Sequence, residues 1–310
     1  MSFLQEPTPL RGQLLAVFPG VDRIVARNSG VMTYHGTNSW FIECDDEVVI
    51  IDPGPDDAVH LQDILTALRG RRLRYILLTH THQDHYGNVR ALKDITGALV
   101  AAYKHPQAKD LIPDVALNNG DLIAGLKAIY TPGHASDHLC FQFLSQSKQK
   151  ILFSGDHVMS WSSSIVNPPD GDMLAYYHSL ETLLGQDDEI YLCGHGPLLE
   201  NPLKLVAELL SSRQRRERMI LADLQKQDWS VASLAARLYH KSNPSLKAAA
   251  QRNVLAHLLK LMTEGVIQEQ PPETEPHPDV IALMKLNEDR SKEFLQCLYN
   301  DSLRRFRICS

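Results

Sequence analysis

The segment at residues 79–85 reads Thr-His-Thr-His-Gln-Asp-His, and it constrains the fold more than any other part of the chain. A short apolar run at residues 75–78 precedes it, so the first histidine lies at the end of an expected strand. Alternate side chains of an extended backbone point to the same side, which directs His80 and His82 toward one point. Imidazole nitrogens that meet at one point are suited to bind a metal cation. The segment therefore predicts a metal centre at the end of a strand.

The same segment supplies two further candidate ligands, because Asp84 and His85 lie at the expected turn into the next helix. They can reach a second cation close to the first. One segment cannot complete two coordination spheres, so other strands must contribute. Histidine or aspartate follows three other apolar runs, as His134, Asp156 and His195. Nitrogen and oxygen ligands of this kind suit two divalent transition metals per chain, Zn²⁺ above all, with iron and manganese also compatible.

The first 202 residues alternate between short apolar runs and stretches with helical spacing. This alternation predicts an α/β domain built from βαβ units. Each candidate ligand comes just after an expected strand, and ligands of open α/β sheets bind at that edge. The strands are expected at residues 21–25, 40–43, 48–51, 75–78, 99–102, 128–130, 139–144, 151–153 and 189–193, and the helices at 58–69, 89–95 and 173–184.

The periodicity changes after Pro202. Three helices and a short strand follow, in an order similar to that of a winged-helix module. These elements are expected at residues 203–225, 231–239, 246–263 and 266–267. A terminal helix is expected over residues 280–306. We therefore divide the chain into a catalytic domain, residues 1–202, and a helical, winged-helix-like domain, residues 203–310.

Composition excludes some protein classes. The net charge of −6 is unevenly divided, because residues 1–202 hold 14 Lys and Arg against 24 Asp and Glu, whereas residues 203–310 hold 17 against 13. No apolar run reaches the ~18 residues of a membrane span, and the N-terminal residues lack the apolar core of a signal peptide. Five cysteines without a CxxC pair fit a reducing compartment. We expect a cytoplasmic protein with no membrane partner, and a homo-oligomer is compatible with the sequence.

The candidate ligands and a turn at residues 52–54 resemble the motifs of the metallo-β-lactamase superfamily. All five motifs of that family are matched in order, over roughly residues 15–200. The matching residues are Asp52-Pro53-Gly54, the segment 79–85, His134, Asp156 and His195. The resemblance implies an αββα sandwich and the activity of a metallohydrolase.

The resemblance also implies a role for each ligand. The implied ligands of the first metal are His80, His82 and His134, and those of the second are Asp84, His85 and His195. Asp156 is implied to bridge the two metals. We interpret Asp52 as a carboxylate that orients a ligand histidine from outside the coordination sphere. His138 and His157 are explained equally well as neighbours of the metal site or as core residues.

A closer resemblance comes from His134-Ala-Ser-Asp137-His138, from Gly194-His195-Gly196-Pro197 and from the winged-helix-like tail. Together these are similar to the β-lactamase-like protein 2 subgroup of the superfamily. That subgroup implies endoribonuclease or phosphodiesterase activity on single-stranded RNA as an alternative function.

The seven ligands predict hydrolysis. Metal binding lowers the pKa of water from ~15.7 to about 7, so a metal-bridging hydroxide can serve as the nucleophile at neutral pH. Asp84 is the candidate catalytic residue, because a ligand carboxylate with a free oxygen can shuttle a proton. A serine nucleophile is not needed, since no serine lies in a GxSxG elbow.

The loop after Asp156 indicates the substrate. Trp161, Ile165 and Val166 are expected to form an apolar wall of the site, and residues 34–38 another part of its rim. An apolar wall favours a small-molecule substrate, either an ester, a thioester or a lactone.

Two alternatives stay open. The cluster of Arg213, Arg215, Arg216 and Arg218 can contact RNA phosphates or form the solvated face of a helix, and the acidic first domain repels a polyanion. A non-hydrolytic di-iron redox module would need a flavodoxin-like partner domain. Residues 203–310 show no pattern of that kind.

Overall fold

The computed structural model describes residues 2–44, 46–240, 244–271 and 292–309. The chain forms two compact units. The first comprises Met1–Ser164 and Ala175–Leu209, and the second Ile165–Leu174 and Leu210–Ser310. The division falls inside the long helix α5 (Pro202–Leu224). Within the described residues, no helix has the length and apolarity to cross a membrane.

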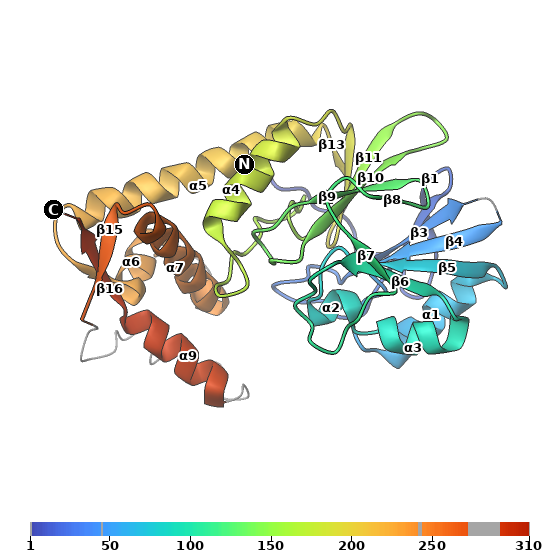
Figure 1. Cartoon of the computed structure of the whole chain (residues 1–310), viewed down its shortest axis with the longest axis horizontal. Coiled ribbons are helices and arrows are strands. Elements are labelled where there is room, and N and C mark those ends of the chain that lie inside the picture. Colours follow the sequence, from blue (N-terminus) through green and yellow to red (C-terminus); the bar gives the residue numbers. More distant parts are fainter. Residues whose placement is uncertain (1, 45, 241–243, 272–291, 310) are drawn as a thin grey trace. The chain divides into compact units, whose positions relative to one another are not determined.

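Two β-sheets form the framework of the first unit (Figure 1). The seven strands of the first sheet follow one another in chain order. They are β1 (Leu15–Phe18), β2 (Val21–Val25), β3 (Asn38–Cys44), β4 (Glu47–Ile51), β5 (Arg72–Leu77), β6 (Leu99–Tyr103) and β7 (Val115–Leu117). The second sheet has the order β13-β12-β11-β10-β9-β8. Its strands are β8 (Leu122–Ile123), β9 (Leu126–Tyr130), β10 (Leu139–Leu144), β11 (Lys150–Gly155), β12 (Ile190–Cys193) and β13 (Leu199–Glu200).

The direction of the strands determines where the loops gather. Strands β4, β5, β6 and β7 pair in parallel, as do β11 and β12. The carboxyl ends of parallel strands meet at the same edge of a sheet. The loops that follow β5, β11 and β12 contain candidate ligands, as expected from the sequence.

The helices of the first unit are α1 (Ala58–Leu68), α2 (Gln83–Tyr86), α3 (Val89–Thr96) and α4 (Met173–Leu184). One apolar core lies between the two sheets and includes Trp40 of the first and Phe153 of the second. A second core joins the first sheet to α1 and α3, through residues such as Ile64 and Leu92. Figure 1 shows these two helices on one side of that sheet. The expected α/β fold with two packed sheets is confirmed.

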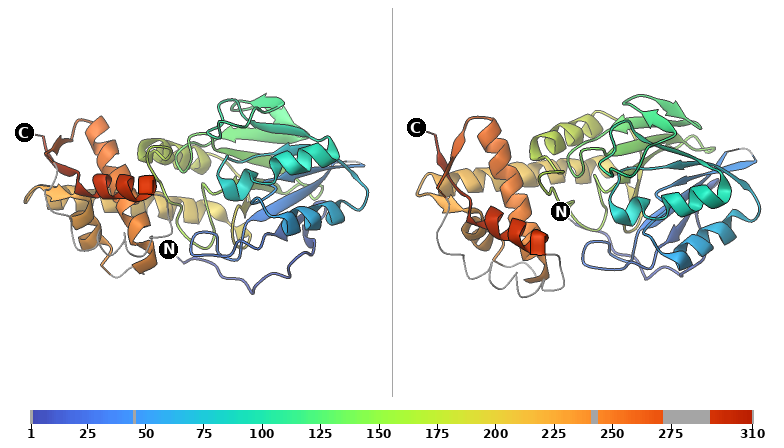
Figure 2. Two further views of the ribbon diagram at one scale, coloured as in Figure 1. Left: turned by 90° about the horizontal axis from the view of Figure 1, so that it is seen from below. Right: turned by 60° about the horizontal axis from the view of Figure 1, so that its bottom comes forward.

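The second unit contains helices and a small sheet (Figure 2). Its elements after α5 are β14 (Trp229–Ser230), α6 (Val231–Leu238), the 3₁₀ turn η1 (Pro244–Leu246), α7 (Lys247–Thr263), β15 (Ile267–Gln270), α9 (Lys292–Leu303) and β16 (Arg305–Ile308). The strands form a sheet of order β14-β16-β15. Helices followed by a small antiparallel sheet constitute a winged-helix arrangement, which confirms the expected class of this domain.

The expected terminal helix over 280–306 is wrong at its end. Helix α9 stops at Leu303, and Arg305–Ile308 forms the central strand of the small sheet; residues 280–291 of the expected helix lie outside the described residues. Residues 305–308 alternate between cationic and apolar side chains, which is the pattern of a strand. Phe306 is completely buried, whereas Arg307 is exposed.

We expect the Phe306→Ala variant to lose about 3–5 kcal/mol of unfolding free energy, because removal of the ring leaves a cavity among α6, α7 and β15. Urea unfolding followed by tryptophan fluorescence measures the loss, since Trp229 is the cross-strand partner of Phe306. The exposed neighbour provides the control, and Arg307→Ala should change stability by no more than about 0.5 kcal/mol. Equal effects of the two variants would contradict the burial of Phe306.

Candidate metal centre

Seven predicted ligands lie together in the first unit, on loops that follow four strands. The loop after β5 continues into α2 and carries four of them, and the loops after β9, β11 and β12 carry one each. In chain order they are His80, His82, Asp84, His85, His134, Asp156 and His195. In three overlapping sets the potential ligand atoms lie within 4.8 Å of one another: a first group of His80, His82 and His134, a second group of Asp84, His85 and His195, and a set of His80, His85 and Asp156 that shares members with both groups.

The first group consists of three histidines. Nδ1 of His82 lies 3.0 Å from Nε2 of His80 and 3.1 Å from Nε2 of His134. The rings of His80 and His134 are nearly perpendicular, with centroids 5.1 Å apart. Three nitrogens this close can all bind a single cation placed between them, as the ligands of a tetrahedral zinc site do.

The second group combines one carboxylate with two imidazoles. Oδ2 of Asp84 lies 3.3 Å from Nε2 of His195 and 3.7 Å from Nε2 of His85. Asp156 lies between the two groups, because its carboxylate is 3.5 Å from His85, 3.4 Å from His195 and 3.8 Å from His134 of the first group. The geometry thus places two potential cation sites on either side of one carboxylate.

A glycine makes room for the Asp156 carboxylate. A Cβ atom at Gly194 would lie 2.4 Å from Oδ1 of Asp156 and 2.8 Å from the ring of His85. Real Cβ atoms do not approach other atoms this closely. Residue 194 therefore has to be glycine if His195 is to lie next to Asp156 and His85. Its backbone also donates to the carbonyl of Gly155, next to Asp156, at 2.8 Å. This fixes two ligand loops to each other.

Asp52 contacts the site from outside the ligand groups. Its Oδ2 accepts a hydrogen bond from Nδ1 of His85 at 2.8 Å, which leaves Nε2 of that ring to face Asp84 and Asp156. Thr79, which was not expected to take part, donates to Asp52 through its hydroxyl at 2.7 Å and through its backbone at 2.8 Å. Its only sequence signal is a small polar residue directly before the first histidine. Asp52 itself has a φ of 55°, a left-handed conformation that these hydrogen bonds stabilise.

Buried charges shift the pKa values of the histidines in opposite directions. Burial, together with three neighbouring imidazoles, lowers the pKa of His80 well below its usual range. Burial also disfavours the charged form of His195, but the carboxylates of Asp156 and Asp84 outweigh it and raise its pKa to about 9. The same balance of burial against carboxylates raises the pKa of His85 well above its usual range. Without metal, burial therefore favours the neutral form of His80, whereas the neighbouring carboxylates favour the protonated forms of His85 and His195.

The donor atoms fit a bound cation. Nε2 of His85, Nε2 of His195 and Oδ1 of Asp156 are buried and have no hydrogen-bond partner among the described residues. A buried polar atom without a partner costs about 1–3 kcal/mol, and coordination to a cation would satisfy all three. Imidazole and carboxylate ligands suit a divalent transition metal.

The two histidines that the sequence left undecided lie behind the ligands. His138 stacks on His80 with ring centroids 5.2 Å apart, and its Nδ1 lies 2.9 Å from the hydroxyl of Thr131. His157 is buried against the ring of Tyr176, with centroids 4.7 Å apart. Neither belongs to a ligand group. The other histidines that were expected to be ordinary residues do not join the groups either, within the described part of the chain, and His277 lies outside it.

The expected rim is present in part. Nδ1 of His195 lies 3.3 Å from the carbonyl of Gly36, so the loop at residues 34–38 borders the ligands. Trp161 stacks on Tyr34 with centroids 5.0 Å apart. The expectation for Val166 is wrong, because its side chain is completely buried and its backbone donates to Asn253 in the second unit. It is therefore not an exposed wall residue.

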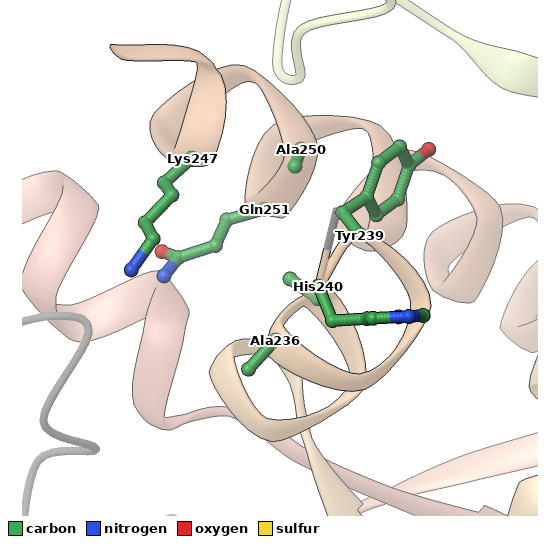
Figure 3. Close-up of a pocket in the computed structure, with 7 residues that line it drawn as sticks. Ala236, Tyr239, His240, Lys247, Ala250 and Gln251 are labelled. Atoms are coloured by element: carbon green, nitrogen blue, oxygen red, sulfur yellow. The ribbon is translucent and has the colours of Figure 1, made fainter. Parts of the chain in front are cut away.

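A small cavity of about 210 Å³ lies in the second unit, between α6 and α7 (Figure 3). Figure 3 shows Lys247 and Gln251 side by side on α7, with Tyr239 and His240 at the end of α6. Among its described lining residues there is one histidine and no carboxylate. The cavity therefore does not have the donor set of the histidine cluster.

The fold agrees with comparisons to known proteins. Residues 32–195 match the family model described as the metallo-beta-lactamase superfamily, which is more than half of the chain. The chain belongs to the metallo-β-lactamase superfamily. Residues 230–272 match the model of the beta-lactamase associated winged helix domain. The protein is thus a hydrolase of this superfamily with a C-terminal winged helix, and the resemblance found in the sequence is confirmed.

Named relatives match most of the chain. An atrochrysone carboxyl ACP thioesterase from Passalora fulva is 31% identical over 263 residues, covering 80% of this chain and 77% of the relative. A beta-lactamase-like protein 2 homolog from Drosophila melanogaster is 28% identical over 273 residues, covering 80% and 89%. The solved structure of a beta-lactamase domain protein from Burkholderia ambifaria has a TM-score of 0.73 at 18% identity, covering 98% of this chain and 96% of that one, and shows the same fold.

We expect metal uptake by this metallo-β-lactamase-fold protein at pH 7 to release protons from His85 and His195, because a ligand imidazole must be neutral. Affinity for Zn²⁺ should therefore rise with pH up to about pH 9, because the pKa of His195 is about 9. Calorimetric titration in buffers of different ionisation enthalpy counts the protons.

The matched variants are His195→Ala, which should reduce the number of protons released, and His80→Ala, which should not, because His80 is already neutral. A proton count near zero for the unaltered protein would contradict the charge distribution described here.

Proposed function

We propose that the protein hydrolyses a small thioester or ester, with lactones as a related class, and that it holds two Zn²⁺ ions. The observation that carries this proposal is the position of Asp156 between two groups of ligands. The first ion would bind to His80, His82 and His134, and the second to Asp84, His85 and His195. When bound, the metals supply a Lewis acid for the scissile carbonyl and lower the pKa of water.

Asp84 is suited to move the proton. Its side chain is 31% exposed, against 9% for Asp156, so it is the ligand carboxylate that a substrate can approach. Burial favours its neutral form, but His85 and His195 outweigh this and hold its pKa below the usual range. Asp84 is therefore ionised at neutral pH and can accept a proton from the attacking water. The carboxylate oxygen that accepts this proton can then pass it to the leaving group.

Asp52 holds the ligands in place during this step. Its hydrogen bond to His85 fixes the orientation of the ring, and its bonds from Thr79 fix the start of the loop that carries His80 and His82. Carboxylates behind metal ligands raise the basicity of the ligand and maintain its tautomer.

Two observations support an acyl substrate. The stacked rings of Tyr34 and Trp161 present aromatic surface next to the loop of His195, and Trp161 covers Gly196, where an added Cβ would lie 2.6 Å from the indole. Such a surface suits the apolar part of an acyl chain. The relatives named as ACP thioesterases support hydrolysis of a thioester.

The arginine cluster gives little support to the RNA alternative. Arg213 is buried and donates to Asn253 at 3.0 Å, and Arg216 donates to the carbonyl of Leu238 at 2.9 Å. Only Arg215 and Arg218 are exposed. The four arginines are therefore neither one phosphate-binding patch nor one solvated helix face, and two of them stabilise the second unit.

We expect Asp84→Asn to reduce turnover by at least about a hundredfold, since the amide cannot accept the proton and binds a cation weakly. Thermal unfolding should change little, because the side chain is partly exposed. Asp94→Asn provides the control, as Asp94 is an exposed carboxylate on the adjacent helix α3. Wild-type turnover of Asp84→Asn, or of protein stripped of metal by a chelator, would rule out this mechanism.

A substrate panel separates the acyl and nuclease proposals. We expect turnover of a chromogenic thioester, with slower turnover of a lactone, and no cleavage of a labelled single-stranded RNA. The double variant Arg215→Glu/Arg218→Glu should leave thioester turnover unchanged. RNA cleavage that this variant abolishes, without thioester turnover in the unaltered protein, would replace the acyl proposal by the nuclease.

A further inference from the structure

Thr81 lies between two ligand histidines, and only 8% of it is exposed. Its hydroxyl donates a hydrogen bond to Oδ2 of Asp137 at 2.5 Å and accepts one from the backbone of Ala108 at 3.0 Å. The residue that separates His80 from His82 is therefore bonded to two other loops.

Asp137 lies three residues after the ligand His134, and 2% of it is exposed. The oxygen that accepts from Thr81 also accepts from the backbone of Gln107 at 2.9 Å. One carboxylate oxygen thus joins three loops, those after β5, β6 and β9. Two of these loops carry all the ligands of the first group.

The two ligand loops belong to different sheets. His80 and His82 follow β5 of the first sheet, and His134 follows β9 of the second. A backbone bond from Leu139 to the carbonyl of Thr79, at 2.7 Å, joins the loops before the first ligand. The bond between Thr81 and Asp137 joins them again, within the stretch that holds the ligands. These two links together limit both the separation and the rotation of the loops.

We propose that Asp137 is a positioning residue for the first ligand group, which fixes His82 relative to His134 through Thr81. Asp52 has the corresponding position at the second group, through His85. Ligands that are held in place before metal binding do not have to be ordered on binding, which increases affinity. The inference rests on the proposed function, because the group that Asp137 orders is the one assigned there to the first ion.

The experiment uses the full chain and four variants. Asp137→Ala removes the acceptor, and Thr81→Val removes the hydroxyl while keeping the shape of the side chain. Thr81→Ser restores the hydroxyl. Ser136→Ala is the matched control, because Ser136 is the neighbour of Asp137 and its hydroxyl accepts from the side chain of Gln107 rather than from a backbone amide. Circular dichroism and thermal unfolding establish that each variant folds.

The first readout is metal affinity. Zn²⁺ is titrated into the metal-free proteins in competition with a chromophoric chelator, which resolves the two binding steps. We expect Asp137→Ala and Thr81→Val to weaken one step about 10–100-fold and to leave the other unchanged. Thr81→Ser and Ser136→Ala should bind both ions with affinities close to those of the unaltered protein.

The second readout needs no metal. The backbone amides of Gln107 and Ala108 donate to Asp137 and Thr81, so their hydrogen exchange in the metal-free protein reports on these bonds. We expect faster exchange at both amides in Asp137→Ala, and at Ala108 in Thr81→Val. Thr81→Ser should exchange as the unaltered protein does.

Unchanged affinities in both steps, or an equal loss in both, would show that Asp137 does not position the first group. If Asp137→Ala does not fold, the comparison of Thr81→Val with Thr81→Ser decides the question alone. A single binding step in the unaltered protein would instead contradict the two-ion proposal. In that case the loss of affinity in Thr81→Val and its rescue by Thr81→Ser still test the positioning role at the remaining step.

Discussion

The carboxylate of Asp156 lies within 4 Å of nitrogens from three histidines, at 3.4, 3.5 and 3.8 Å, and the rest of the site is arranged around it. A buried carboxylate is costly unless positive charge or hydrogen bonds compensate it. In the metal-free molecule the protonated rings of His85 and His195 provide this charge. Two divalent cations would provide it more completely, since they would also satisfy the ring nitrogens that have no hydrogen-bond partner.

This arrangement requires loops from two sheets to meet at one place. Parallel pairing brings the ends of β5 and β6 to one edge of the first sheet and the ends of β11 and β12 to one edge of the second. The apolar core between the sheets then holds these edges together, with Leu77 and Phe153 a few residues before the ligand loops. Because each ligand group takes members from both sheets, a change in this core would alter the distances within both groups.

The sequence predicts this site well because each ligand follows a strand with a clear apolar pattern. Strand β10, Leu139–Leu144, has the expected bounds, whereas β5, Arg72–Leu77, begins three residues and ends one residue before the expected 75–78. Contacts between distant loops leave no such periodicity. Thr79, which bonds Asp52, is an ordinary threonine in the sequence. The two-residue strand β14 is too short to show a pattern in the sequence. The sequence therefore does not show that residues 305–308 have this strand to pair with.

The uneven charge of the chain has a structural cause in each unit. In the first, three carboxylates that would otherwise repel one another, Asp52, Asp84 and Asp156, are gathered around buried imidazoles, so part of the negative charge belongs to the site. In the second, Arg213 is buried and Arg216 half-buried, and both bind neighbouring groups of the same unit. The net charge of this part of the chain includes these two arginines as if they were exposed. The charge that a polyanion would meet is therefore smaller than the composition indicates, and the acidic, metal-binding half of the molecule is the better guide to its chemistry.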